Sequence, residues 1–396
     1  MFTKKNCAAF LFLWSTAITL CVICILGVSS NSVLATSIPS PLETIFNEME
    51  QSTVKVVNTI PTNLFNPQVQ NKTELGTGYV FDDKGHVITA YHVLSGVTTV
   101  EVMTSEGESY EALLLGADPF SDVAVMEIER KIPISNETFI LPTLKSDADI
   151  RNITLKNVTM GNSTSLNVGD PVVTVGYGFG SSSPSMTGGL VSMTDYLLPF
   201  PAEGFSIPAM IQSDVTVNPG DSGGPLVDLT GKVIGMIYGR LNPVGVPLGQ
   251  FPGITIAIPS NIVSKVASSI VEKGYYLHPG IGIMGETVSS DLVRRLAGSV
   301  NNMSIPQGVF VSKIERNSTA DLAGIHGSVI NEYGEILGGD VVTALDGIPV
   351  TRFEDLLSYV QEHKSVGDNI AFSVYRNGQT MELQGVVLTF HPFDPM

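Results

Sequence analysis

Cysteine is scarce in this chain of 396 residues, and its distribution is uneven. All three cysteines, Cys7, Cys21 and Cys24, lie near the N-terminus. The rest of the chain therefore cannot form disulfides and must be stabilised by buried apolar side chains. Cys21 and Cys24 form a Cys-x-x-Cys pattern inside an apolar run, which favours a membrane-embedded or lipidated segment over a redox pair.

Positive charge is also in short supply. Lys and Arg number 21 against 38 Asp and Glu, so the net charge is -17 and the pI is about 4.7. No basic cluster follows Lys4-Lys5, and the composition therefore argues against a nucleic-acid-binding surface. The six histidines lack the spacing of metal ligands. We expect neither a metal nor another cofactor.

The N-terminal residues 1–28 predict a signal peptide or a transmembrane anchor. The uncharged run from Ala8 to Val28 is 21 residues long, enough to cross a bilayer as a helix. This length favours a retained anchor, although Val33-Leu34-Ala35 keeps signal cleavage open. Lys4-Lys5 place the N-terminus inside and the rest of the chain outside. We therefore expect an extracytoplasmic protein, either held in the membrane by residues 8–28 or secreted.

Seven Asn-x-Ser/Thr triplets follow this segment, as expected of a glycoprotein if the host modifies exported chains. Three of them crowd into Asn152–Thr164, which predicts an exposed loop. The acceptor positions are Asn71, Asn136, Asn152, Asn157, Asn162, Asn302 and Asn317.

Beyond a linker at residues 29–41, the pattern is that of a mainly β protein. The apolar spacing of residues 42–49 predicts a short opening helix. From Val54 to about Ile258, short β-branched runs alternate with turn residues, which predicts antiparallel barrels, and the length suits two. Residues 260–273 have helical periodicity, and Gly274 is placed to end that helix.

A second unit with α+β patterning is predicted at residues 280–390, after a linker at residues 269–279. Its strand patterns lie near residues 308–311, 340–345 and 370–375, and its helical patterns near residues 320–323 and 353–362.

The segment Asn218–Leu226 reads Asn-Pro-Gly-Asp-Ser-Gly-Gly-Pro-Leu and places Ser222 between glycines. Glycine permits a tight turn in which amide N–H groups converge near an exposed hydroxyl. Such convergence is typical of an oxyanion hole, which stabilises a tetrahedral acyl-transfer intermediate. A plain Pro-Gly-Asp turn between strands is the alternative interpretation.

A serine nucleophile needs a base, usually a histidine oriented by a carboxylate. His92 closely follows the β run at residues 87–90, which places it at the end of a strand. Asp122 directly precedes the apolar strand at residues 123–128, where burial would require a hydrogen-bond donor such as an imidazole. The other histidines have weaker contexts, with His86 in a turn and His278 in a linker.

The order His92, Asp122, Ser222 is that of chymotrypsin-type enzymes. Together with Gly76–Phe81, Ile88–Val93, Ser121–Val125 and Asn218–Leu226, it resembles the HtrA/DegP family of trypsin-like serine proteases over residues 42–390. The resemblance implies a chymotrypsin-like double β-barrel at residues 42–268 and hydrolysis of peptide bonds through an acyl-enzyme. It also implies quality control of misfolded or exported proteins and assembly as a homotrimer.

By this resemblance, Ser222 is the nucleophile, His92 is the general base and then acid, and Asp122 orients His92. The N–H groups of Gly220 and Ser222 would form the oxyanion hole, with the N–H of Asp221 between them. Most family members have Asn before the nucleophile, so Asp221 is a departure that leaves the regulation of the hole open.

The expected substrate pocket is apolar. By position, Val217, Met236, Ile237 and Tyr238 should line the site for the side chain that precedes the cut. We therefore expect a preference for a small or medium aliphatic residue, since no carboxylate is placed to bind a basic one.

The C-terminal unit, residues 280–390, resembles a PDZ domain. Gly280-Ile281-Gly282-Ile283 resembles its carboxylate-binding loop, and residues 338–350 and 317–325 resemble its turn-strand-turn and first helix. A groove of this type binds peptide C-termini or extended segments by β-augmentation.

Two other functions remain open. The chain could be a catalytically silent PDZ-containing chaperone or scaffold that binds exposed apolar peptides. An esterase would use Gly-x-Ser-x-Gly before a helix, but here a β run follows Ser222 and the histidine precedes it.

Overall fold

The computed structural model describes residues 39–60, 72–94, 96, 99–132, 155–200, 205–241, 253–296 and 305–389. Helix α2 (Pro41–Glu50) opens this part of the chain, as the sequence predicted, and buries Ile45 and Met49. It lies against strands β1 and β8 of the two barrels described below.

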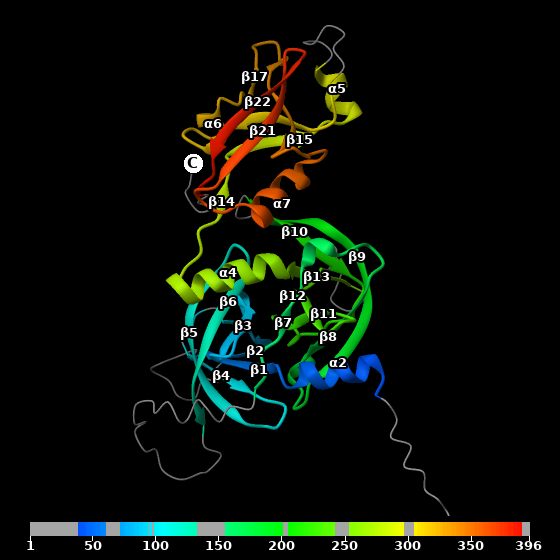
Figure 1. The fold of residues 1–396 in the computed structure, drawn as a ribbon, viewed down its shortest axis with the longest axis vertical. Helices are drawn as coiled ribbons and strands as arrows, with labels where there is room; N and C mark the ends of the chain where they lie inside the picture. The colour runs from blue at the N-terminus through cyan, green and yellow to red at the C-terminus, as the bar shows by residue number, and fades with distance from the viewer. Residues whose placement is uncertain are drawn as a thin grey trace, which may run out of the picture. The chain divides into compact units, whose positions relative to one another are not determined.

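Six antiparallel strands form a first closed barrel in the order β1-β2-β3-β6-β5-β4 (Figure 1). Strand β3 is buried along its whole length because it pairs with β2 on one side and β6 on the other. The strands are β1 (Thr53–Ile60), β2 (Lys72–Val80), β3 (His86–Ala90), β4 (Thr99–Met103), β5 (Ser109–Asp118) and β6 (Val123–Ile132).

A second barrel has the order β11-β8-β9-β10-β13-β12 and is closed by pairing of β11 with β12. A short strand, β7 (Thr159–Met160), joins β12 in parallel. The two barrels confirm the predicted mainly β architecture. The other strands are β8 (Pro171–Gly176), β9 (Ser185–Phe200), β10 (Phe205–Ser213), β11 (Pro225–Asp228), β12 (Lys232–Leu241) and β13 (Ile254–Pro259).

The barrels share a continuous apolar core. It includes Val54 and Val87 from the first barrel and Met210 and Ile258 from the second. A fully buried side chain of this kind stabilises the fold by about 1.5–3 kcal/mol. This core replaces the disulfides that the sequence cannot form.

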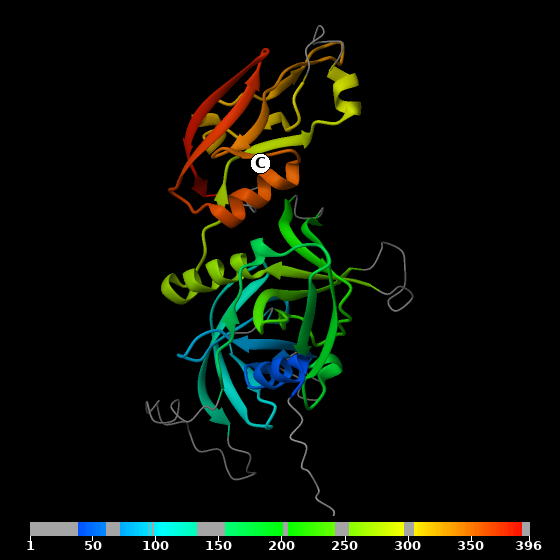
Figure 2. The ribbon, with the colours of Figure 1, turned by 45° about the vertical axis from the view of Figure 1, so that its right-hand side comes forward.

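Helix α4 (Ser260–Lys273) confirms the predicted helix and ends at Gly274, which adopts the left-handed conformation with φ +83°. Figures 1 and 2 show it lying across both barrels, and it contacts β5 and β6 of the first and β12 and β13 of the second. Because α4 continues to Lys273, it crosses the boundary at residue 268 that the sequence suggested for the first domain.

The C-terminal domain is built on a sheet in the order β15-β16-β19-β21-β22, and its own core includes Phe372 and Leu356. Strand β15 is the edge of this sheet. The strands are β15 (Ile283–Thr287), β16 (Val309–Ile314), β19 (Val341–Leu345), β21 (Asn369–Arg376) and β22 (Gln379–Val386). The helices are α5 (Ser290–Leu296), α6 (Thr319–Ala323) and α7 (Phe353–His363).

Four short elements complete this domain. Strand β14 (Pro279–Gly280) pairs with β23 (Leu388–Thr389), and β17 (Ser328–Ile330) pairs with β18 (Ile336–Gly338). Strand β20 (Ile348–Pro349) pairs with β19.

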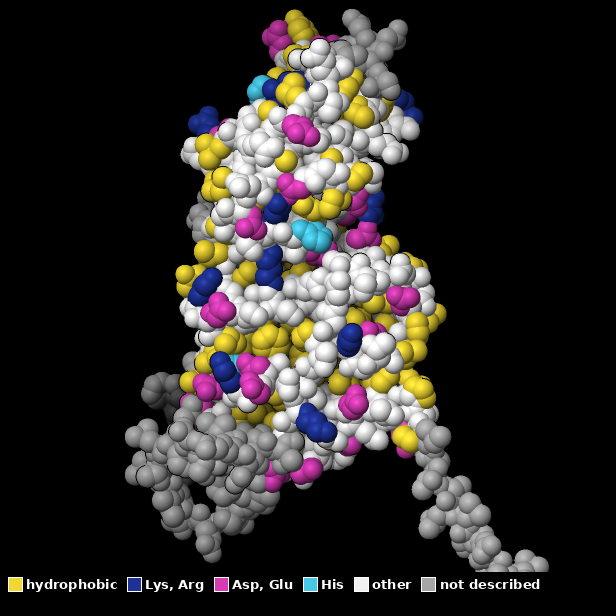
Figure 3. Space-filling view, in the orientation of Figure 1, with side chains coloured by type: hydrophobic (Ala, Val, Ile, Leu, Met, Phe, Trp, Pro, Cys, Tyr) yellow, Lys and Arg dark blue, Asp and Glu magenta, His cyan; other side chains and the backbone are white. Residues whose placement is uncertain are grey.

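The predicted span at residues 8–28 lies outside the described residues. Within the described ranges, no helix is both long and apolar enough to cross a membrane. Asn157, Asn162 and Asn317 are exposed, while Asn71, Asn136, Asn152 and Asn302 fall in the parts that the structure does not describe. On the face shown in Figure 3, Lys and Arg side chains stand apart and form no basic patch.

Candidate active site

The carboxylate of Asp122 binds His92 at two points. Its Oδ1 accepts a hydrogen bond of 2.8 Å from the backbone N–H of His92, and its Oδ2 lies 2.7 Å from the imidazole Nδ1. The backbone carbonyl of Asp122 accepts a third bond, from the N–H of Tyr91. His92 lies on η1 (Tyr91–Leu94), a turn of 3-10 helix that follows β3. The structure thus brings together two residues that stand 30 positions apart.

The two side chains differ in exposure as a base and its orienting carboxylate should. Asp122 is 7% exposed and His92 is 46% exposed. Burial disfavours the charged imidazole, but the hydrogen bond and charge of Asp122, with the charge of Glu74, outweigh this effect. The pKa of His92 is therefore raised above its ordinary value.

Asp122 adopts φ +56°, a conformation that is costly for any residue other than glycine. The preceding turn holds it there. Asp118 Oδ2 accepts hydrogen bonds from the backbone N–H and the hydroxyl of Ser121. Asp118 therefore caps this turn. His278 Nε2 lies 2.8 Å from the same oxygen, so the histidine that the sequence assigned to a plain linker is a buried partner of this turn.

The sequence context of His86 likewise did not predict its burial or its carboxylate partner. It is buried, and its Nδ1 lies 2.6 Å from Asp82 Oδ2. His86 and Asp82 thus form a second histidine–carboxylate pair. Within the described ranges, no contact connects this pair to a turn that carries a serine.

The turn that carries Ser222 is folded tightly against its neighbours. Gly220 has φ +106° and Gly223 has φ +84°. A Cβ on Gly220 would lie 2.6 Å from the carbonyl oxygen of Tyr177, and one on Gly223 would overlap the carbonyl oxygen of Thr77. Glycine is therefore required at both positions for conformation and for space.

The hydroxyl of Ser222 donates a hydrogen bond of 3.3 Å to the backbone carbonyl of Tyr238. The ring of Tyr238 in turn lies edge-on to His92, with 5.7 Å between the ring centroids. Tyr238 therefore contacts Ser222 through its carbonyl and His92 through its ring. In this state the hydroxyl is bonded to a carbonyl, and proton transfer to His92 requires it to turn to the imidazole. Such bonds often tighten only when substrate binds.

Two of the three amides proposed for the oxyanion hole are available. Within the described ranges, the N–H groups of Gly220 and Ser222 have no protein acceptor. The N–H of Asp221 donates to the carbonyl of Asn218 and is thereby taken. Two convergent donors are the usual complement of an oxyanion hole.

The carboxyl group of Asp221 is buried beneath this turn. Its Oδ2 accepts a hydrogen bond of 2.8 Å from the N–H of Asn218. Burial raises the pKa of Asp221, and hydrogen bonds from the N–H groups of Asn218 and Gly178 only partly oppose this effect.

The expected pocket residues point to different sides of the second barrel. Val217 and Ile237 lie in one apolar cluster, whereas Met236 lies in the main core with Tyr238 packed against it. Met236 and Ile237 are successive residues of β12 and therefore face opposite ways. The sequence missed Thr77, which bonds the Ser222 turn from β2, and the carbonyl of Tyr238. Neither has a side-chain motif that spacing alone would reveal.

In the C-terminal domain, the segment Gly280–Ile283 leads directly into the edge strand β15. Ile281 and Ile283 are buried, and Gly282 has φ +69°. The carbonyls of Ile281 and Gly282 accept hydrogen bonds from Ala320 and Glu315. Helix α7 contacts β15, so a helix and a sheet edge lie side by side.

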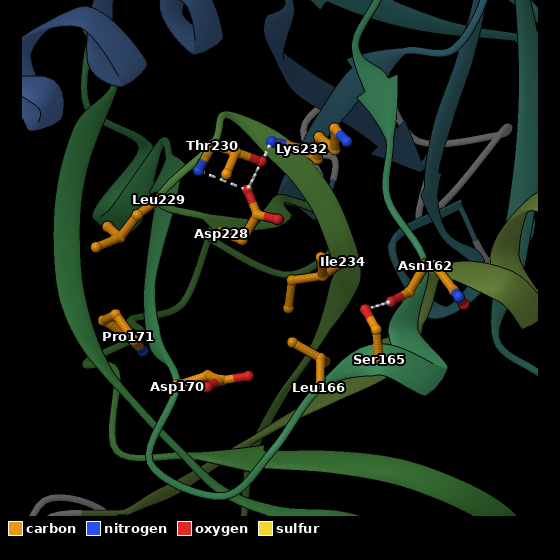
Figure 4. A pocket seen from close by; sticks show the side chains of 10 residues that line it. All are labelled: Asn162, Ser165, Leu166, Asp170, Pro171, Asp228, Leu229, Thr230, Lys232 and Ile234. Carbon is orange, nitrogen blue, oxygen red and sulfur yellow. Dashed lines mark hydrogen bonds between the residues drawn. The ribbon is translucent and has the colours of Figure 1, made fainter.

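A cavity of about 280 Å³ lies elsewhere on the second barrel (Figure 4). Its lining includes Asn162, Asp170 and Asp228 and contains none of the candidate active-site residues. Across the residues that the structure describes, no group of three or more His, Cys, Asp or Glu side chains is arranged to hold a metal ion.

Replacing Asp122 by Asn should lower the pKa of His92, because the variant removes the negative charge that favours the imidazolium. Nuclear magnetic resonance titration of the imidazole measures this directly. Asp82→Asn is the matched control, since it removes the partner of His86 and should leave the pKa of His92 unchanged. An unchanged pKa in Asp122→Asn would show that the pair does not govern His92.

Replacing Asp221 by Asn should change the pH dependence of stability. Because the folded-state pKa of Asp221 is raised, the protonated form is favoured by folding. Its stabilising contribution is complete below the unfolded value of about 3.9 and is lost as pH rises through the folded pKa. The Tm of Asp221→Asn should therefore increase relative to the Tm of the wild type as pH rises. A difference in Tm that stays constant with pH would contradict this account.

Comparison with known proteins follows the same division of the chain. Residues 76–236 match the trypsin-like peptidase domain, and residues 279–385 match the PDZ domain. The periplasmic serine endoprotease DegP of Escherichia coli K12 is 32% identical over 317 residues, which cover 80% of this chain and 57% of DegP. The chain thus spans just over half the length of that relative.

Two further proteins agree. Protease Do-like 1, chloroplastic, of Arabidopsis thaliana is 29% identical over 362 residues, covering 88% of this chain and 74% of the relative. The solved structure of the HtrA-type protease AlgW with tripeptide has a TM-score of 0.62 at 24% identity and covers 89% of this chain and 98% of its own, a likeness of fold. From both domains, their order and these relatives, the chain belongs to the HtrA family of trypsin-like serine proteases with a C-terminal PDZ domain.

Proposed function

We propose that this protein is a serine endopeptidase that hydrolyses peptide bonds through an acyl-enzyme. The observation that carries the proposal is the Asp122–His92 pair, joined by two hydrogen bonds. The glycine turn of Ser222 packs at Gly223 against Thr89 and Ala90, just before His92 in the chain. Membership of the HtrA family supports the same activity.

In the proposed reaction, His92 Nε2 takes the hydroxyl proton of Ser222 as Oγ attacks the substrate carbonyl. The negative oxygen that forms is stabilised by the N–H groups of Gly220 and Ser222. His92 then gives its proton to the leaving amine, which releases one product. A water molecule, deprotonated by His92, attacks the acyl-enzyme, and return of the proton to Ser222 frees the second product.

Asp122 does not accept the proton in this scheme. Its carboxylate keeps Nδ1 of His92 protonated, so that Nε2 is the free base, and it stabilises the imidazolium that forms. The raised pKa of His92 fits this role, because a base must attract the proton of Ser222.

The proposed substrates are unfolded or misfolded polypeptides, in which a cleavable strand is exposed. We propose that Val217 and Ile237, which share one apolar cluster, and Met236 and Tyr238, on the other face of β12, contribute to an apolar environment around the cut. A small or medium aliphatic side chain before the cut fits this environment. The periplasmic relatives support quality control of exported proteins as the setting.

The C-terminal domain is proposed to bind peptide C-termini or extended segments. A peptide would add as a further strand to the edge of β15, beside α7. The loop at Gly280–Ile283 would supply backbone N–H groups to the terminal carboxylate. The buried Ile281 and Ile283 fix the position of that loop.

The finer setting of the protein is likewise proposed. An extracytoplasmic location fits the periplasmic relatives, with residues 8–28 as an anchor or a cleaved signal. Homotrimer assembly follows from the family resemblance. Exposed Asn157, Asn162 and Asn317 are the sequons among the described residues open to glycosylation. The division into residues 1–28, 29–41, 42–268, 269–279 and 280–390 is retained, with α4 extending the first domain to Lys273.

Labelling with a fluorophosphonate and digestion of an unfolded polypeptide test the endopeptidase. Wild type should label at Ser222 and cleave after aliphatic residues. Ser222→Ala should not label and should lose about 10⁶-fold in kcat, because it lacks the nucleophile. Ser182→Ala, which alters an exposed serine elsewhere, is the control and should behave as wild type.

Two outcomes would contradict this assignment. Peptide binding without labelling or cleavage by wild type would favour the catalytically silent scaffold. Cleavage chiefly after Lys or Arg would refute the apolar pocket.

A further inference from the structure

Thr77 joins the two halves of the candidate active site. It lies on β2 in the first barrel and is fully buried. Its backbone N–H donates a hydrogen bond of 2.9 Å to the carbonyl of Ser222. Its hydroxyl donates a bond of 2.7 Å to the carbonyl of Gly220 and accepts one of 3.0 Å from the N–H of Tyr177. Thr77 thus contacts both the turn that carries Ser222 and the neighbouring segment at Tyr177.

The bond to Gly220 matters because Gly220 carries one of the proposed oxyanion donors. Peptide units are planar, so holding the carbonyl of Pro219 also holds the N–H of Gly220, which belongs to the same unit. The carbonyl of Pro219 accepts a bond of 2.6 Å from the N–H of Phe179, and the carbonyl of Gly220 accepts the hydroxyl of Thr77. The trans geometry of the peptide then turns the N–H of Gly220 away from Phe179.

Glycine at this position makes such restraint necessary. Without a Cβ, Gly220 can adopt positive and negative φ with little difference in energy. Its observed φ of +106° therefore depends on the contacts of its neighbouring peptide units. The hydroxyl of Thr77 donates one hydrogen bond and accepts another, so it holds the Gly220 carbonyl and the backbone at Tyr177 at once.

We propose that Thr77 is a positioning residue for the oxyanion hole. Its hydroxyl holds the peptide unit after Gly220, while the N–H of Phe179 holds the unit before it. Together these bonds keep Gly220 at the φ that aims its N–H at the substrate carbonyl. The inference rests on the proposed peptidase activity. It gives a function to Thr77 in the Gly76-Thr77-Gly78 segment. The roles of Ser222, His92 and Asp122 do not by themselves account for this segment.

The test compares Thr77→Val, which keeps the shape and loses the hydroxyl, with Thr77→Ser, which keeps the hydroxyl. Thr77→Val should lose about 10²-fold in kcat with KM nearly unchanged, because the oxyanion forms only in the transition state. Affinity for a peptide aldehyde, whose bound hemiacetal oxygen occupies the hole, should fall in parallel with kcat/KM. Thr77→Ser should restore most of both.

Thr255→Val is the matched control. Thr255 is also fully buried, and its hydroxyl donates to the carbonyl of Val215 rather than to the Ser222 turn. It should reduce Tm in the same way as Thr77→Val but keep kcat and aldehyde affinity.

The remaining outcomes overturn one or both proposals. Unchanged kcat and aldehyde affinity in Thr77→Val, with an active wild type, would refute the positioning role and leave the peptidase intact. Equal losses in Thr77→Val, Thr77→Ser and Thr255→Val would reduce the effect to stability and refute it as well. A wild type that neither labels nor cleaves would overturn both proposals.

Discussion

The site depends first on the carboxylate of Asp122. This one group is bonded to the backbone and the ring of His92, while its own carbonyl receives the N–H of Tyr91. Burying a charge is costly unless donors surround it, and here the donors are the groups that must be oriented. The same hydrogen bonds therefore stabilise the buried charge of Asp122 and orient the imidazole ring of His92. The positive φ of Asp122 is tolerated because the Asp118 turn holds it.

The turn that carries Ser222 belongs to the second barrel. Close contacts with neighbouring segments, rather than local conformational preference, determine its backbone conformation. Gly220 and Gly223 lie where a side chain would collide with the backbone of neighbouring segments. Thr77 then ties the turn to the first barrel. In the described state, the hydroxyl of Ser222 is bonded to the carbonyl of Tyr238.

Local patterns predicted much of this protein. The alternation of β-branched runs predicted the barrels, and the apolar spacing of residues 260–273 predicted α4. The family resemblance implied that Asp122 orients His92. Contacts between segments that are distant in the sequence could not be predicted. His278 meets Asp118 across 160 positions, and Thr77 meets Gly220 across 143. Nothing in the sequence near either residue specifies its partner, because tertiary packing decides it.

The pH dependence of covalent labelling at Ser222 tests the central claim most directly. If the Asp122–His92 pair activates the hydroxyl, the rate of fluorophosphonate labelling should rise with pH through an inflection above about 6.5, the ordinary pKa of histidine. The adduct should be found by mass spectrometry on Ser222. A rate that does not change across this range, or an adduct on a different residue, would contradict the account.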